Sequence, residues 1–223
     1  TMRKAIGLLV AGVLAAAGPA AAANLAGLAS PLGAGRFAVS GFVAYGEQDV
    51  EDGTPDEVST RRMLGRVQAG VVDGLDLYAF LGFSDIQFNQ ANFEGTLGGL
   101  GGLGAKIGLL RSGDVRVVAD LQAEFDQSKD GSRKVRHQAY HLAGYVVREI
   151  GAAGKVGYMY PFAGIRFTAS RYDADGKLDD YRQDSFLGVF GGADYFVNPN
   201  VYFTGEVHLF DETSIYLGVG HRF

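Results

Sequence analysis

The segment VRVVADLQAEFD, residues 115–126, decides the fold because its side chains alternate between two kinds with a period of two residues. One set contains Val115, Val117, Ala119, Leu121, Ala123 and Phe125, and the other contains Arg116, Val118, Asp120, Gln122, Glu124 and Asp126. Successive side chains of a strand point to opposite faces, whereas a helix would scatter both sets around its axis. The segment is therefore predicted to be a β-strand with one apolar and one mainly polar face.

The same alternation runs from Arg36 to the end of the chain and is clear again in residues 201–210. We predict ten strands, at residues 36–46, 59–71, 75–84, 97–110, 115–126, 135–148, 155–170, 185–197, 201–210 and 214–223. Pro161 lacks an amide donor, so a bulge is expected there. The expected fold class is all-β: a closed antiparallel up-and-down barrel of about ten strands, with eight as the alternative.

The connections between these strands alternate in length. The short ones are residues 72–74, 111–114, 151–154 and 198–200. The others are mostly longer and polar, at residues 47–58, 85–96, 127–134 and 171–184, with a short last one at 211–213. Short turns on one rim and long loops on the other are typical of transmembrane β-barrels with both termini in the periplasm.

Composition excludes several classes of function. The 223 residues carry 20 Lys and Arg against 25 Asp and Glu, so the basic surface of a nucleic-acid-binding protein is absent. There is no Cys, which excludes disulfides, thiol catalysis and a lipid anchor on an N-terminal cysteine. Glycine is abundant, with 34 residues, and no collagen-like repeat accompanies it.

The chain divides into three segments. Residues 1–23 read as a signal peptide, with Arg3 and Lys4 before an apolar run and small residues up to the expected cleavage point after Ala23. Residues 24–35 are small and poor in charge, and we expect a flexible periplasmic tail. Residues 36–223 form the expected barrel domain.

Alternation alone does not say which face meets lipid, since a soluble barrel also alternates. Export, strands of about ten residues and aromatic residues near strand ends favour a membrane barrel. Those aromatics are Tyr45, Phe83, Phe125, Tyr158, Tyr160, Tyr195 and Phe223. The polar face reads as a lumen with a charge network that has five residues of each sign, because isolated buried charges are very costly. The network comprises Arg62, Arg66, Lys106, Arg116 and Arg166 with Asp76, Asp120, Glu124, Asp194 and Glu206.

The C-terminal segment SIYLGVGHRF, residues 214–223, resembles the last strand of Gram-negative outer-membrane barrels. With the export signal and alternating loops, the chain resembles the small OmpA/OmpX-like outer-membrane β-barrel superfamily, although His221 stands where an aromatic residue is common. The resemblance implies that the outer-membrane barrel assembly machinery reads Tyr216, Leu217, Gly218, Val219 and Phe223. It also implies a monomer in the outer membrane, with lipid, lipopolysaccharide and periplasmic chaperones as partners.

Few residues suggest chemistry. The run GLGGLG at residues 99–104 fits a dinucleotide motif, but a strand pattern follows it where that motif needs a helix, so no cofactor is expected. No metal is expected either, because the spacing of Asp173 and Asp175 fails for a calcium loop. Glu206, His208 and Ser214 leave a lipid hydrolase as a low-ranked alternative. A basic set can contact lipopolysaccharide phosphates: Lys129, Arg133, Lys134 and Arg136.

These observations predict a non-enzymatic outer-membrane barrel whose lumen is largely filled by side chains. Its extracellular loops would give it an adhesion-type or envelope-stabilising role at the cell surface. A narrow porin-like channel, a lipid-modifying enzyme and a secreted soluble barrel are the alternatives. No site residue is assigned to catalysis.

Overall fold

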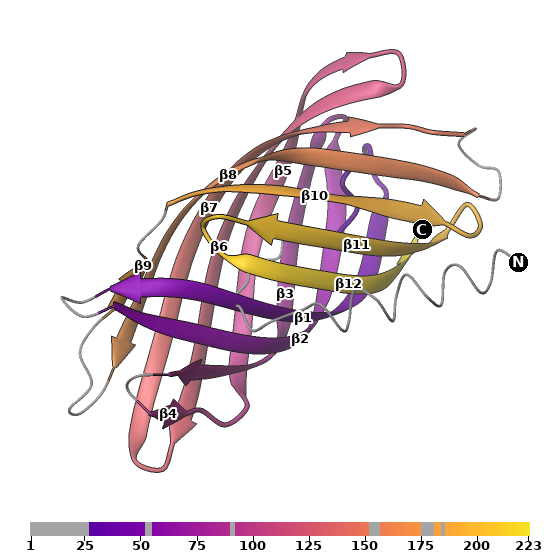
Figure 1. The fold of residues 1–223 in the computed structure, drawn as a ribbon. Coiled ribbons are helices and arrows are strands. Elements are labelled where there is room, and N and C mark those ends of the chain that lie inside the picture. The colour runs from indigo at the N-terminus through magenta and orange to yellow at the C-terminus, as the bar shows by residue number, and fades with distance from the viewer. Residues whose placement is uncertain (1–26, 52–54, 90–91, 152–156, 175–180, 184–185) are drawn as a thin grey trace, which may run out of the picture.

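Ten long strands hydrogen-bond into a closed antiparallel ring in the computed structural model, and two short strands are added at one rim (Figure 1). The ring consists of β1 (Phe37–Glu51), β2 (Pro55–Val72), β3 (Leu75–Phe88), β5 (Gly98–Ser112), β6 (Val115–Asp130), β7 (Arg133–Arg148), β8 (Tyr158–Ala174), β10 (Leu187–Phe196), β11 (Val201–Leu209) and β12 (Thr213–Arg222). The short strands are β4 (Phe93–Glu94) and β9 (Tyr181–Gln183). Pairing of β12 with β1, from Ala38 opposite Arg222 to Glu47 opposite Thr213, closes the ring.

The structure describes residues 27–51, 55–89, 92–151, 157–174, 181–183 and 186–223. The predicted signal peptide lies outside these residues, as do residues 175–180 of the acidic loop. Within the described ranges, no helix is long and apolar enough to cross a membrane.

The barrel is polar inside and apolar outside over most of its height. On β6, Leu121 is 46% exposed, whereas its neighbours Asp120 and Gln122 are buried. On β11, Val207 is exposed while Glu206 and His208 are buried. A soluble barrel has the opposite arrangement, so this is the arrangement of a transmembrane barrel.

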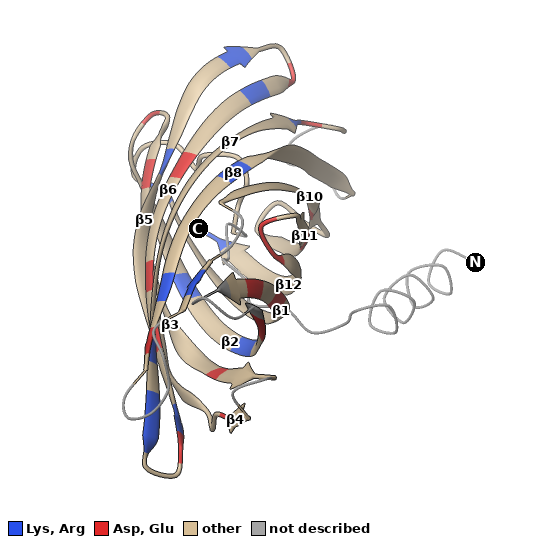
Figure 2. Ribbon diagram, turned by 60° about the vertical axis from the view of Figure 1, so that its left-hand side comes forward, with Lys and Arg blue, Asp and Glu red and all other residues tan. Residues whose placement is uncertain are grey.

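The outward face changes character toward the rim that carries β4 and β9. On β7 it runs through Val146, Leu142 and Tyr140, and then becomes polar at Gln138 and Arg136. The adjacent strands β6 and β8 change in the same way, as do β1 and β2 elsewhere in the ring, and Figure 2 shows charged residues near the ends of the long strands. We call the apolar part the belt and the polar extension beyond it the collar.

The inward face changes in the opposite sense at the same height. Inside the collar, a buried apolar cluster contains Val50, Val58, Ile86, Phe88, Phe93, Val135 and Tyr172. The collar is therefore polar outside and apolar inside, as a part of a protein surrounded by water is. The belt has the reverse arrangement, so one continuous sheet is adapted to two solvents.

Two of the predicted long loops, at residues 47–58 and 127–134, are much shorter than expected because their strands continue into the collar. The predicted loop at residues 127–134 is a hairpin in which Asp130 pairs with Arg133 around a tight turn. Gly131 adopts a φ of +58° in that turn, a conformation that glycine tolerates best. The predicted strands end where their outward residues cease to be apolar. The hydrogen bonds between strands continue beyond that point, because backbone pairing does not require lipid.

The two sides of the barrel differ in height. Strands β6, β7 and β8 have 16, 16 and 17 residues, whereas β10, β11 and β12 have 10, 9 and 10. In the collar, β9 pairs with both β8 and β1, which the three shorter strands separate in the ring below (Figure 1). The turn between β11 and β12 therefore ends beneath β9.

The expected bulge at Pro161 is not present. Pro161 causes no bulge: the β7–β8 ladder lapses beside it and resumes at Ile150 and Met159 in unchanged register. The register shifts occur instead at Gly70/Val72 and Gly108/Leu110.

Two expectations about aromatic residues also fail. Tyr158 and Tyr160 face the lumen and pack against Phe196, so they do not belong to an interfacial girdle. Alternation along residues 201–210 places Phe210 on the same face as Glu206 and His208, but it is 76% exposed because β11 ends at Leu209.

The belt and the collar predict different costs for the same substitution on one strand. Leu142→Arg should lower the free energy of unfolding in lipid vesicles by about 2–4 kcal/mol, because it places a charge on the lipid face at mid-depth. Gln138→Arg, on the same face of β7 in the collar, should cost about 0–1 kcal/mol. Denaturant titration of both variants measures the difference, and equal small costs would contradict the assignment of the belt.

Candidate functional site

The lumen holds the N-terminal segment of the described chain, residues 27–35. The backbone amide of Ala29 donates to Asp194 Oδ2 over 2.8 Å, and that of Leu32 donates to Asp76 Oδ2 over 2.9 Å. Lys106 Nζ in turn donates to the carbonyl oxygen of Leu28 over 3.1 Å. Charged groups of the wall thus bind the backbone of this segment, and the expectation of a flexible tail is wrong for these residues.

Packing reinforces these hydrogen bonds. Leu28 and Ala29 are each 2% exposed and belong to the same buried cluster as Tyr145, whose hydroxyl donates to the Ala29 carbonyl oxygen. At Gly70, an added Cβ would lie 2.0 Å from the carbonyl oxygen of Gly33, so only glycine allows the segment to approach β2 this closely. The segment fills the end of the lumen opposite the collar.

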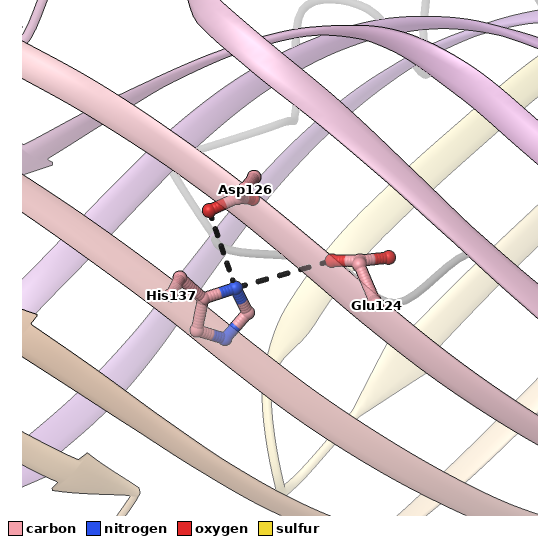
Figure 3. Close-up of side chains that lie close together, drawn as sticks. All are labelled: Glu124, Asp126 and His137. Carbon is pink, nitrogen blue, oxygen red and sulfur yellow. Dashed lines mark ion pairs between the residues drawn. The ribbon is translucent and has the colours of Figure 1, made fainter.

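A second set of contacts crosses the middle of the lumen. Arg62 on β2 donates to Glu124 Oε1 over 2.6 Å and to Asp126 Oδ2 over 3.1 Å, and both carboxylates project from β6. His137 lies directly opposite Asp126 on β7, with its Nδ1 3.4 Å from Asp126 Oδ1 and 4.0 Å from Glu124 Oε1 (Figure 3). The His137 ring stacks on Tyr172 at 4.3 Å between centroids, so the collar cluster packs against this set.

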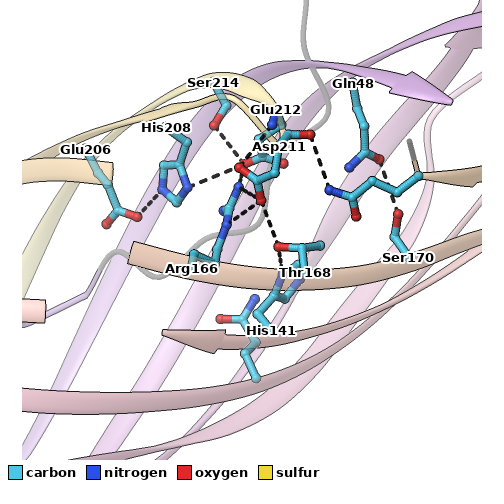
Figure 4. A network of polar contacts seen from close by, with 12 residues as sticks. Gln48, His141, Arg166, Thr168, Ser170, Glu206, His208, Asp211, Glu212 and Ser214 are labelled. Carbon is cyan, nitrogen blue, oxygen red and sulfur yellow. Dashed lines mark hydrogen bonds and ion pairs between the residues drawn. The ribbon is translucent and has the colours of Figure 1, made fainter. Parts of the chain in front are cut away.

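A third set holds the turn between β11 and β12 inside the wall. Arg166 on β8 lies 2.7 Å from Asp211 Oδ2 and 2.9 Å from Glu212 Oε1 (Figure 4). Thr168 donates to Asp211 over 2.9 Å. Both turn carboxylates are buried, and the guanidinium of Arg166 compensates one of their two charges.

The geometry does not assemble the Ser–His pair of the hydrolase alternative. Ser214 Oγ donates to Glu212 Oε1 over 2.9 Å, while the two ring nitrogens of His208 face Glu206 and Glu212 (Figure 4). A nucleophilic serine of a Ser–His–acid triad donates to its histidine, whereas the hydrogen bond described for Ser214 goes to Glu212.

The predicted charge network is thus split into separate sets. Nine of its ten members are buried, Arg116 is half-buried, and Arg66 lies over the Tyr78 ring at 3.5 Å. Three further buried carboxylates join the sets: Asp126, Asp211 and Glu212. Asp126 continues the inward alternation of residues 115–126, so the sequence pattern contained a signal for it; Asp211 and Glu212 belong to a predicted outer turn and carried no such signal.

The expected balance of charge is absent. Among the described residues, ten buried carboxylates stand against four buried Lys and Arg side chains. The carboxylates are Asp56, Asp76, Asp85, Asp120, Glu124, Asp126, Asp194, Glu206, Asp211 and Glu212, and the cations are Arg62, Arg66, Lys106 and Arg166. Asp85 lies on the outward face of β3 beside Arg61, and the other nine carboxylates face the interior. The interior is acidic, and this excess must be compensated by hydrogen-bond donors, protons or bound cations.

The glycine run at residues 99–104 has a packing role. A Cβ on Gly102 would lie 2.2 Å from the Phe80 ring, and one on Gly104 would lie 2.3 Å from the Tyr78 ring. These inward glycines of β5 make room for large rings from β3, and β5 continues as a strand beyond them.

The five residues predicted as the assembly signal lie in or directly after the C-terminal strand β12. Tyr216 is buried in the lumen, while Val219 and Phe223 are exposed on the other face of the C-terminal strand and segment. Phe223 stacks on Phe37 at 4.5 Å, beside the β1–β12 seam. Leu217 and Gly218 pair with Val43 and Phe42 of β1.

The basic set is divided by the strand pleat. Lys129 and Arg136 are exposed on the outer face of the collar, and Lys134 lies directly opposite Lys129. Arg133 bends away to Asp130 and the carbonyl oxygen of Asn92, with its guanidinium over the Phe93 ring.

No protein-family model and no curated protein sequence matches the chain. Among solved structures, the translocator domain of the autotransporter NalP from Neisseria meningitidis aligns with 10% identity over 84% of this chain and 87% of that one, with a TM-score of 0.47.

Two smaller barrels also align. The N-terminal β-barrel domain of Pseudomonas aeruginosa OprF shows 13% identity over 86% of this chain and 99% of that one, with a TM-score of 0.38. Ail, the attachment invasion locus protein of Yersinia pestis, shows 14% identity over 85% and 99%, with a TM-score of 0.34.

The position of Arg62 between two buried carboxylates predicts a large cost for its removal. Arg62→Met should lower the free energy of unfolding by about 3–5 kcal/mol, because it leaves buried charge without its partner. Arg61→Met is the matched control: its side chain is 66% exposed and its contact with Asp85 is 3.8 Å long. That control should cost no more than about 1 kcal/mol in the same denaturant titration. Equal costs would contradict an essential role of the Arg62 contacts.

Proposed function

We propose that the chain is a monomeric outer-membrane barrel with a closed lumen, which stabilises the cell envelope or mediates adhesion through its collar. The closed lumen is the observation that carries this proposal. Residues 27–35 occupy one end, the ion pairs of Arg62 and Arg166 cross the middle, and the apolar collar cluster covers the other end. Barrels of this strand number have room for little more than their own side chains.

Two alternatives receive less support. A porin-like channel needs a continuous water path, and three successive layers of buried side chains lie along the lumen axis. A lipid-modifying enzyme needs an activated nucleophile near the outer interface, and Ser214 is bound to Glu212 instead. We infer that the chain is not an enzyme and that its working surface is the outer face of the collar.

The collar offers a surface suited to lipopolysaccharide phosphates. Lys129 and Lys134 are directly opposite each other on neighbouring strands, an arrangement of like charges that is unfavourable unless an anion compensates it. Arg136 adds a third cation on the same face. Directly below, the rings of Phe125 and Tyr140 meet edge to face at 6.4 Å and mark the outer edge of the belt. Lipid phosphates lie at this height, just above the acyl chains.

Electrical recording tests the closed lumen. The full chain in a planar bilayer should show no stable conductance, because all three layers are in place. Deletion of residues 27–35 should produce conductance or frequent openings, since it removes one layer and leaves Asp76 and Asp194 open to water. Heat-modifiable gel mobility confirms that both forms are folded. Stable conductance by the full chain would overturn the proposal in favour of the channel.

Removal of the two opposed lysines tests the lipopolysaccharide contact. The double variant Lys129→Ser, Lys134→Ser should bind purified lipopolysaccharide roughly 30-fold more weakly, at about 1 kcal/mol for each cation near an anionic surface. The control variant Arg36→Ser, Arg111→Ser loses the same charge at the opposite rim and should bind normally. Equal weakening in both variants would show that only net charge matters.

A further inference from the structure

One group of side chains in the lumen has the composition and spacing of a metal site. Glu124, Asp126 and His137 are all buried, and they offer one ligand atom each within 4.8 Å of one another (Figure 3). We propose that these three residues bind a divalent transition-metal ion of the Zn²⁺ type.

The distance between the ligand atoms of His137 and Asp126 fits such an ion. Zn²⁺ binds histidine nitrogen and carboxylate oxygen at about 2.0–2.2 Å, so two ligand atoms of a tetrahedral site lie roughly 3.4 Å apart. His137 Nδ1 lies 3.4 Å from Asp126 Oδ1 and 4.0 Å from Glu124 Oε1. Three protein ligands leave a fourth position for water, and a small adjoining cavity lined by Glu124, His137 and His141 has room for about one water molecule.

The hydrogen bonding of the group also points to a missing ligand. Asp126 Oδ1 and His137 Nδ1 face each other as an ion pair at 3.4 Å, and neither atom has a hydrogen-bond partner among the described residues. Their residues are 4% and 5% exposed, so bulk water does not reach them. Buried polar atoms of native proteins are normally satisfied, and an ion bound between these two would satisfy both.

Arg62 is compatible with the ion because it uses other lone pairs. It binds Asp126 through Oδ2 and leaves Oδ1 toward His137, while Glu124 Oε1 is shared. The two carboxylates and Arg62 carry one net negative charge, and the excess of buried carboxylates extends beyond them. A hard oxygen-only ion such as Mg²⁺ or Ca²⁺ would gain little from the imidazole, so the donor set favours a transition metal.

Metal loading of the full chain tests the site. The chain is refolded into detergent with a chelator, with Zn²⁺ or with Co²⁺, because the collar cluster covers the site once the barrel has closed. The expected result is one tightly held equivalent of metal after desalting, together with the visible absorption of four-coordinate Co²⁺. Absence of retained metal in the folded wild-type chain overturns the proposal.

Matched variants separate the site from adventitious binding. His137→Gln should weaken binding more than about 100-fold, since even outer-shell substitutions around metals cost 10–100-fold. His208→Gln is the control: it is equally buried, does not line the small cavity beside the site, and its ring nitrogens face Glu206 and Glu212 outside the three ligands. Asp126→Asn serves as a second ligand variant if His137→Gln does not fold. Equal binding by ligand and control variants overturns the proposal.

The Arg62→Met variant provides an independent readout. With a metal site present, loss of the neighbouring guanidinium should raise Zn²⁺ affinity and make the thermal stability of this variant strongly dependent on Zn²⁺. A purely structural ion-pair cluster would show no such dependence, and that result would overturn the proposal.

Discussion

Every backbone polar group at bilayer depth must find its partner within the protein, since hydrocarbon offers none. The ten-strand ring meets this constraint through the β1–β12 seam, where ten successive residue pairs join the two ends of the barrel. Closure has a consequence for the side chains. The inward half of each strand is confined to a narrow space away from bulk water, so its charged residues must be compensated locally.

The reversal of polarity at the collar shows that side chains, and not the backbone, adapt the sheet to its surroundings. Strand β7 is continuous from Arg133 to Arg148, yet its outward residues change from polar to apolar along its length. Its inward residues change in parallel, from Val135 in the collar to His141 in the belt. Hydrogen-bond geometry is the same throughout, so the pattern of side chains alone defines where lipid begins.

The period-two pattern was sufficient to predict the architecture because it reports directly on which side of a strand each residue lies. It identified the ten ring strands and the inward position of residues such as Asp120, Glu124 and Glu206. It could not place Asp211 and Glu212, because a turn has no period and the inward fold of this one depends on Arg166, 45 residues away. The ends of the strands were misplaced for a related reason: at Gln127 and Arg136 the outward face becomes polar, which resembles a loop in sequence although the ladder continues.

The N-terminal segment shows why the lumen could not be read from the strands alone. Asp194 and Asp76 each lie within a lumen that has too few cations to pair with all its carboxylates. The backbone amides of Ala29 and Leu32 supply donors to them instead, across separations of 165 and 44 residues. The dependence is mutual, because the amides of this segment would be unsatisfied in the same space without those carboxylates. The acidic wall and the N-terminal segment therefore stabilise each other. Within the described part of the chain, no such segment reaches Asp126 and His137 in the middle of the lumen. Arg62 compensates one of the two carboxylate charges there, and the other needs a proton or a further cation.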